Sequence, residues 1–235
     1  MWSRRRVAHP EPALRPVVAP TGLTKVEFTA LTPEPLAFLG QAAALQLEFF
    51  EGLALAVMRA PDLAAKEGVS AAAGIALRAH HALIAELRRE GVEPVSMMAP
   101  FSAGLDRFRA AIAGDDWYEL LLAIHLSSGL LDDFSIRLAG GLPADLRTRV
   151  RAILGEAALG PRLEAQLLPA IAEIPGLGDR LALWGRRVVG DTLLVARSAL
   201  RAAERPSHLQ DEVEPVFTEL IGDHTRRMDA LGLTA

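Results

Sequence analysis

The sequence has no cysteine among its 235 residues, and aromatic residues make up only 5% of it. Disulfide bonds, zinc–thiolate sites and thiol catalysis are therefore excluded. The scarcity of aromatic side chains, together with the abundance of alanine and leucine, favours helices and leaves little material for β-strands. The absence of cysteine also fits a reducing compartment, and we expect a cytoplasmic protein.

Membrane spans and a strong positive charge are missing as well. No stretch reaches the roughly 18 apolar residues that a membrane-spanning helix requires, so we expect no membrane partner. Only Lys25 and Lys66 are lysines, and a net charge of −4 is not typical of a general nucleic-acid binder. Phosphate-binding loops, nucleophile elbows, zinc motifs and heptad repeats are also absent.

The N-terminal segment differs from the rest of the chain. It contains Arg4–Arg6 with no apolar run after them, so it does not read as a secretory signal. Its four prolines between residues 10 and 20 exclude a continuous helix. We predict a flexible N-terminal arm over residues 1–31 and a single helical domain over residues 32–235.

Helical patterns follow one another through that domain, with no strand pattern between them. The predicted helices cover about residues 35–60, 62–90, 101–114, 115–138, 179–204 and 215–231, with a further helix from Pro143 that kinks or breaks near Gly160–Pro161. The proline-containing stretch 91–100 is interpreted as a linker. Long helices with short connections predict an all-α fold, an antiparallel four-helix bundle with two additional C-terminal helices.

The helix predicted over residues 35–60 is apolar around most of its circumference. Its polar residues Gln41, Glu48, Glu51 and Arg59 fall on one narrow stripe, which we expect to face solvent. The alternative is that Glu48 and Glu51, which are three residues apart, are a pair of metal ligands. Gln46 points away from the stripe into the apolar side, where a buried amide needs hydrogen-bond partners.

Two adjacent histidines occur in "ALRAHHALIAEL", residues 76–87. Neighbours on a helix point about 100° apart, so the two cannot share a role. His81 lies among charged residues and is expected in solvent. His80 shares a face with Val69, Leu83 and Leu87 and is expected in the core.

Two later helices also place polar residues on inward faces. On the helix from residue 115, one side is polar and is expected to line a pocket or an inter-helix seam; it comprises Tyr118, His125, Ser128 and Asp132. Glu119, Asp133 and Arg137 of that helix are expected in solvent. On the last helix His224 lies within an apolar stripe and needs a partner, for which Asp191 is a candidate.

Three segments resemble a known family. They are "MAPF…F…DW" between the second and third long helices, "RLALWGRRVVGDTLL" at residues 180–194, and "HTRRMDALGL" near the end. The chain resembles the actinobacterial ferritin-like proteins over about residues 32–235. These proteins are similar to tRNA 2-methylthio-isopentenyladenosine hydroxylase, a di-iron enzyme. The resemblance implies a ferritin-like bundle and a position for its metal site.

In ferritin-like di-iron proteins two helices each give a carboxylate, and two others each give a carboxylate and a histidine three residues later. Laid on this chain, that pattern falls at Gln46, at Leu77 and His80, near Ser128, and at Glu156 and Leu159. The resemblance therefore implies a site reduced to Gln46, His80, Ser128 and Glu156. These side chains can form hydrogen bonds with one another without a metal, and Glu156 is then the expected partner of His80.

Three functions remain open. The first is a metal-free, non-enzymatic interaction or scaffold protein without a cofactor, whose partner is a second copy of the chain or another protein. The second is an oxygenase or hydroxylase with an altered site, in which iron or manganese is held by His80, Glu156 and either Glu48 or Asp132. By resemblance it would act on modified tRNA or a hydrophobic substrate. The third is binding of nucleic acid through arginines, namely Arg147, Arg149, Arg151, Arg186 and Arg187.

Overall fold

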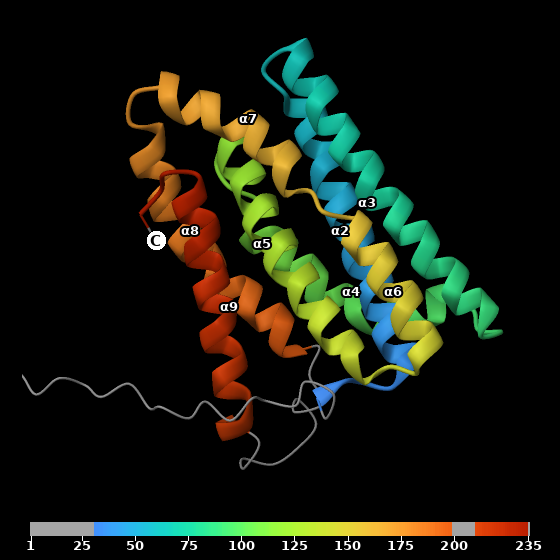
Figure 1. Cartoon of the computed structure of the whole chain (residues 1–235). Helices are drawn as coiled ribbons and strands as arrows, with labels where there is room; N and C mark the ends of the chain where they lie inside the picture. The colour runs from blue at the N-terminus through green and yellow to red at the C-terminus, as the bar shows by residue number, and fades with distance from the viewer. Residues whose placement is uncertain (1–30, 199–209, 235) are drawn as a thin grey trace, which may run out of the picture.

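The structure is a computed structural model that describes residues 31–198 and 210–234. Within these ranges it is helical and has no strand, which confirms the all-α prediction (Figure 1). The helices are α2 (Pro35–Arg59), α3 (Leu63–Arg89), α4 (Pro94–Ala111), α5 (Trp117–Leu138), a 3-10 turn η1 (Ala139–Gly141), α6 (Ala144–Glu156), α7 (Gly160–Glu173), α8 (Leu177–Ser198) and α9 (Gln210–Ala230). Of the predicted arm only Leu31 is described, and it is buried in the core.

Helix starts follow local capping chemistry. The Asp62 side chain accepts a hydrogen bond from the Ala65 amide at 2.8 Å and so caps α3. The Asp116 side chain accepts one from the Glu119 amide at 3.0 Å and caps α5. Such caps satisfy amide groups that have no partner within the helix.

The prediction of a linker over residues 91–100 is wrong, because α4 already begins at Pro94. A proline in the first helical turn loses no hydrogen bond, so Pro94 starts this helix instead of preventing it. Pro100 lies inside the same helix. The break predicted near Gly160–Pro161 is confirmed, since α6 ends at Glu156 and α7 begins at Gly160.

The helices form a four-membered bundle with three helices packed outside it. The bundle consists of α2, α3, α5 and the pair α6 and α7, which together occupy the fourth position. Helix α4 packs across α2, while α8 packs on α5 and α9 packs on both α5 and α8 (Figure 1). None of the described helices has the combined length and apolar character needed to cross a membrane.

Helices α2 and α4 approach each other closely at Gly40. A Cβ atom added there would lie 2.3 Å from the backbone oxygen of Met97, which cannot move like a side chain. We expect Gly40→Ala to lower the free energy of unfolding by about 1–3 kcal/mol through overpacking. Urea unfolding measures this loss. Gly155→Ala on an exposed part of α6 is the control, and equal behaviour of the two variants would contradict the close approach.

Candidate functional site

The interior of the bundle contains one polar side-chain pair between α2 and α5. Gln46 Nε2 donates a hydrogen bond to Asp132 Oδ1 at 2.6 Å. The exposed fractions of the two residues are 1% and 7%. Gln46 Oε1 has no hydrogen-bond partner among the described residues. Gln46 therefore points inward, as its position on the helix predicts.

The environment of Asp132 keeps its carboxyl group mostly neutral. Burial raises the pKa of this carboxyl to about 8, although the hydrogen bond from Gln46 opposes the rise. A charge in an apolar interior is costly unless it is paired, and protonation is the usual way in which a lone buried acid avoids that cost.

His80 faces the core, as predicted, but its predicted partner is wrong. Its Nδ1 atom bonds to the backbone oxygen of Ala43 at 2.8 Å. Glu156 is instead exposed at the end of α6. The buried residues of α6 are Leu146, Val150 and Leu154. Glu156 lies two positions, or about 200°, around the helix from Leu154 and so faces away from the core. Burial lowers the pKa of His80, and the bond to Ala43 opposes this shift.

Ser128 is buried but does not contact the Gln46–Asp132 pair by a hydrogen bond. Its hydroxyl donates to the backbone oxygen of His125 within the same helix at 3.4 Å. The four residues that the resemblance implies, Gln46, His80, Ser128 and Glu156, therefore have separate partners. A role for any of them in function stays a prediction.

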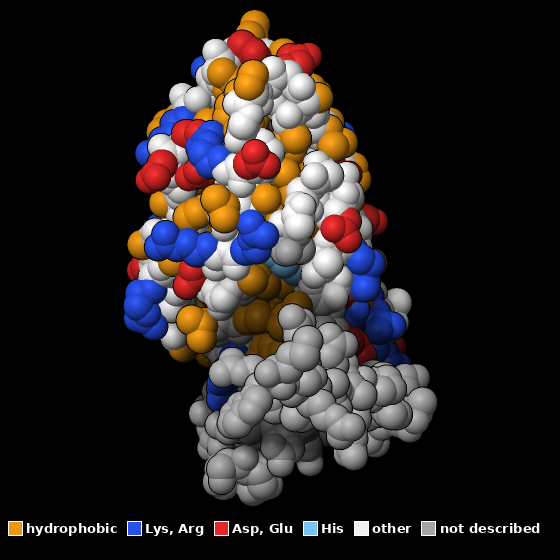
Figure 2. All heavy atoms as spheres, turned by 90° about the vertical axis from the view of Figure 1, so that its left-hand side faces the viewer, with side chains coloured by type: hydrophobic (Ala, Val, Ile, Leu, Met, Phe, Trp, Pro, Cys, Tyr) orange, Lys and Arg blue, Asp and Glu red, His pale blue; other side chains and the backbone are white. Residues whose placement is uncertain are grey.

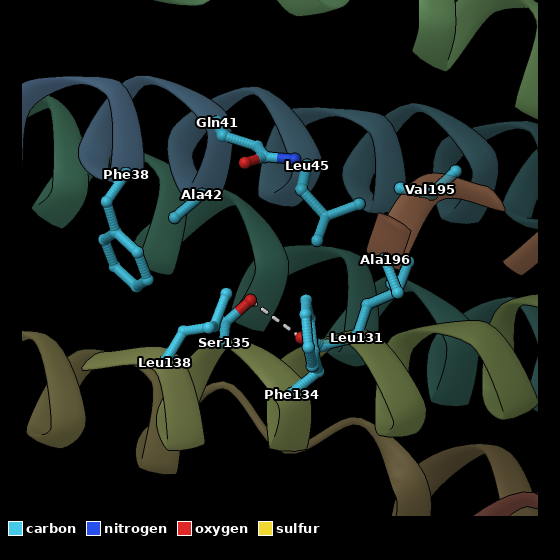
Figure 3. A pocket seen from close by; sticks show the side chains of 10 residues that line it. All are labelled: Phe38, Gln41, Ala42, Leu45, Leu131, Phe134, Ser135, Leu138, Val195 and Ala196. Atoms are coloured by element: carbon cyan, nitrogen blue, oxygen red, sulfur yellow. Dashed lines mark hydrogen bonds between the residues drawn. The ribbon is translucent and has the colours of Figure 1, made fainter. Parts of the chain in front are cut away.

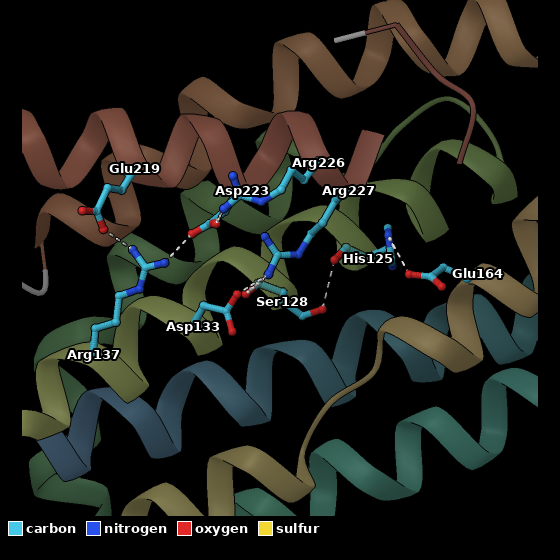
Figure 4. Close-up of polar contacts among 10 residues, drawn as sticks. His125, Ser128, Asp133, Arg137, Glu164, Glu219, Asp223, Arg226 and Arg227 are labelled. Atoms are coloured by element: carbon cyan, nitrogen blue, oxygen red, sulfur yellow. Dashed lines mark hydrogen bonds and ion pairs between the residues drawn. The ribbon is translucent and has the colours of Figure 1, made fainter. Parts of the chain in front are cut away.

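A layer of ion pairs joins α5 to α9 (Figure 4). Arg137 bonds to Glu219 at 2.7 Å and to Asp223 at 2.8 Å, while Arg227 binds Asp133. Asp133 and Arg137 were predicted to face solvent, but both are half-buried. Helix α9 covers this side of α5, which the pattern of α5 alone does not reveal.

His125 lies beside this layer and has no hydrogen bond from either ring nitrogen to the described residues. It is 2% exposed, and its Nε2 atom is 3.8 Å from Glu164 Oε1 (Figure 4). Burial, followed by the charge of Arg227, lowers the pKa of His125 to about 4. His125 is therefore a neutral, unsatisfied group near neutral pH, which is rare in protein interiors.

His224 is buried on α9, as predicted, but the proposed pairing with Asp191 does not form. Its Nε2 atom has no hydrogen-bond partner among the described residues. Asp191 is half-buried on α8, where it lines a cavity next to α2 and α4. Burial, followed by the charge of Arg227, lowers the pKa of His224 to about 4.

Three buried glutamates are matched with arginines from later helices. Glu48 bonds to Arg109, with the shortest contact at 2.5 Å, and the remaining pairs are Glu86–Arg149 at 2.9 Å and Glu119–Arg180 at 2.8 Å. Glu48 and Glu119 were both expected in solvent, and this prediction is wrong.

Helix α4 covers the polar stripe of α2 at Glu48, whereas Gln41 is half-buried and Glu51 and Arg59 are exposed. Tyr118 is also half-buried.

No three histidine, aspartate or glutamate side chains come together to hold a metal ion in the described ranges 31–198 and 210–234. The nearest acids to the bundle interior are either neutral, as at Asp132, or paired with arginine, as at Glu48. The carboxylate-rich ligand set of a di-iron centre therefore does not fit the residues present.

A family model described as "Ferritin-like domain, actinomycetes" matches residues 35–209, about three quarters of the chain. That range includes the whole four-helix bundle and its Gln46–Asp132 pair. No curated protein matches the sequence. The match and the bundle architecture agree, and the chain belongs to the ferritin-like domain family of actinomycetes.

Proposed function

We propose that this ferritin-like domain works without a di-iron centre, as a non-enzymatic interaction or scaffold protein. The observation that supports this proposal is the Gln46–Asp132 pair. Between α2 and α5 this pair supplies only one amide group and one carboxyl group, and burial raises the pKa of that carboxyl to about 8. We interpret the pair as what is left of an ancestral metal site.

Charge balance supports the same proposal. Two iron cations in an interior of low dielectric need several ionised ligands to offset their charge. The buried glutamates cannot supply them, because Glu48, Glu86 and Glu119 each bind an arginine. These arginines neutralise the acids that a metal would require, and they cross-link helices instead.

The altered-site oxygenase, acting on modified tRNA or a hydrophobic substrate, receives less support. It requires His80, Glu156 and a further carboxylate to converge on one metal ion. Glu156 is exposed, while Glu48 is held by Arg109 and Asp132 by Gln46. His80, Glu48 and Asp132 thus each have a hydrogen-bond partner within the protein, and Glu156 faces solvent.

Binding of nucleic acid also receives less support, because most of the arginines that suggested it have contacts within the protein. Arg147 donates to the Gly140 carbonyl oxygen, Arg149 to Glu86, and Arg151 to the Ile136 carbonyl oxygen. Arg187 lies over the Trp184 ring at 5.7 Å. On the face shown in Figure 2, basic side chains are interspersed with acidic ones and do not form one basic patch.

Interaction with a second copy or another protein is the function that we assign to the exposed apolar side chains. Met58 and Leu63 are 74% and 79% exposed where α2 passes into α3, and Leu183 on α8 is 64% exposed. Helix α4 packs on α2 and covers part of its apolar circumference, so we place the interface at these exposed residues instead. Contiguous apolar patches mark protein interfaces, whereas single exposed apolar residues are also common on monomers, so the solution mass decides the assignment.

Metal content and solution mass test the proposal together. Protein purified without chelator should contain far less than one iron or manganese ion per chain, and anaerobic addition of either metal should leave the unfolding temperature unchanged. Light scattering should give the mass of a dimer. Stoichiometric metal that disappears in Asp132→Ala and His80→Ala would contradict the metal-free assignment, and a monomeric mass would contradict the dimer.

A further inference from the structure

A cavity of about 500 Å³ lies between α2, α4 and α8, away from the Gln46–Asp132 pair. Its apolar wall includes Leu45 of α2, Phe101 and Phe108 of α4, and Leu194 and Val195 of α8. Cavities of roughly 300–1,000 Å³ with mainly apolar walls and a few polar groups are typical of small-molecule sites.

A second, smaller cavity of about 20 Å³ lies next to the first and shares Gln41, Leu45 and Val195 with it. Figure 3 shows the side chains that line it, with Phe38 on α2 and Phe134 on α5 as its aromatic members. Ser135 is its hydroxyl residue, and that hydroxyl donates to the Leu131 carbonyl oxygen. The lining of the smaller cavity is therefore mainly apolar.

Three polar side chains line the large cavity without partners of their own. Arg107 of α4, which is exposed at the rim, and the half-buried Asp191 of α8 form no ion pair with any described residue, and the half-buried Gln41 of α2 forms no hydrogen bond with one. Arg107 can only donate hydrogen bonds, Asp191 accepts them, and the Gln41 amide does both. The charges of Arg107 and Asp191 cancel, so the lining favours a neutral group that both donates and accepts.

Gly104 keeps the cavity open from the α4 side. A Cβ atom added there would meet no heavy atom of the described residues within 4 Å. Glycine inside a helix is less stable than alanine by about 1 kcal/mol, and no steric contact in the described structure requires it here. A larger side chain at Gly104 would extend into the space that the cavity occupies.

We propose that this cavity binds a neutral, elongated apolar molecule whose polar head carries a hydroxyl or amide group. The apolar body occupies the space between Leu45, Phe108 and Val195, and the head lies between Arg107 and Asp191. Binding here does not depend on whether the bundle interior holds metal.

Calorimetric titration of the full chain with n-decanol and n-octanol tests the proposal. We expect n-decanol to bind and n-octanol to bind about fifteenfold more weakly, as expected for two fewer buried methylene groups. Decanoate and decylammonium should each bind about tenfold more weakly than n-decanol or worse. Attraction of the charged head by one of Arg107 and Asp191 is offset by repulsion from the other, which leaves the cost of desolvating the charge. Failure of n-decanol to bind, or stronger binding by a charged probe, would overturn the proposal.

The matched variants are Gly104→Leu and Gly155→Leu. Both place leucine at a helical glycine whose added Cβ meets no described atom within 4 Å, but only Gly104 lines the cavity. Gly104→Leu should remain helical by circular dichroism and lose n-decanol binding by about tenfold or more. Gly155→Leu should bind as the native chain does. Equal binding by a folded Gly104→Leu would place the ligand elsewhere.

Discussion

Asp132→Asn is expected to stabilise the protein increasingly as the pH rises. Burial raises the folded-state pKa of Asp132 to about 8 from an ordinary value of 3.8. A raised pKa means that stability is fully present below pH 3.8 and is lost as the pH rises toward 8, because only the unfolded chain ionises readily. Asparagine keeps the acceptor for Gln46 and has no proton to lose. The difference in the free energy of unfolding between the variant and the native chain should therefore grow by on the order of 4 kcal/mol between about pH 5 and pH 8.

Urea unfolding at several pH values measures this gain, with the slope of the unfolding transition checked for two-state behaviour. Asp229→Asn changes an exposed carboxyl near the end of α9 and is the control. Its stability should follow that of the native chain at each pH. A difference between Asp132→Asn and the native chain that does not change with pH would show that Asp132 is ionised in the folded protein.

His125→Leu is expected to stabilise the protein, with the larger gain in acid. The folded-state pKa of His125 is lowered by burial to about 4 from 6.5. The unfolded chain therefore binds a proton that the folded chain refuses, and stability falls as the pH drops from 6.5 to 4. Leucine removes up to about 3 kcal/mol of this acid destabilisation. It also removes two ring nitrogens that have no partner among the described residues, which adds on the order of 1 kcal/mol at neutral pH.

Unfolding by urea at about pH 7 and pH 4.5 checks the result. His81→Leu is the matched control, since His81 is exposed on α3 and should show little change at either pH. His224 stays in place in both variants and accounts for the acid sensitivity that remains. Loss of stability in His125→Leu at both pH values would indicate that water or another group satisfies the ring nitrogens of His125.

Sequence periodicity predicts which way a side chain faces more reliably than it predicts what that side chain meets. The inward positions of Gln46 and His80 follow from the 3.6-residue repeat of their own helices. Their partners, Asp132 and the Ala43 carbonyl oxygen, depend on how far one helix slides along another. Periodicity within one helix contains no information about that offset.

Burial of charged residues is harder to predict, because it depends on an arginine supplied from elsewhere. Glu48 and Glu119 lie on polar stripes, and polar stripes usually face water. Each is covered by a later helix that brings its own guanidinium, from Arg109 and Arg180 respectively. The abundance of arginine relative to lysine was the available signal, since arginine is the preferred partner in buried ion pairs.

The three glutamate–arginine pairs share one further property, which is their spacing along the chain. The residues of each pair are 61 positions apart for Glu48–Arg109, 63 for Glu86–Arg149 and 61 for Glu119–Arg180. At a translation rate of about 5–20 residues per second, each acid is incorporated roughly 3–12 seconds before its arginine. Because an unpaired charge is costly in the interior, each acid is expected to stay hydrated until its arginine has been made, and the three pairs become available in chain order.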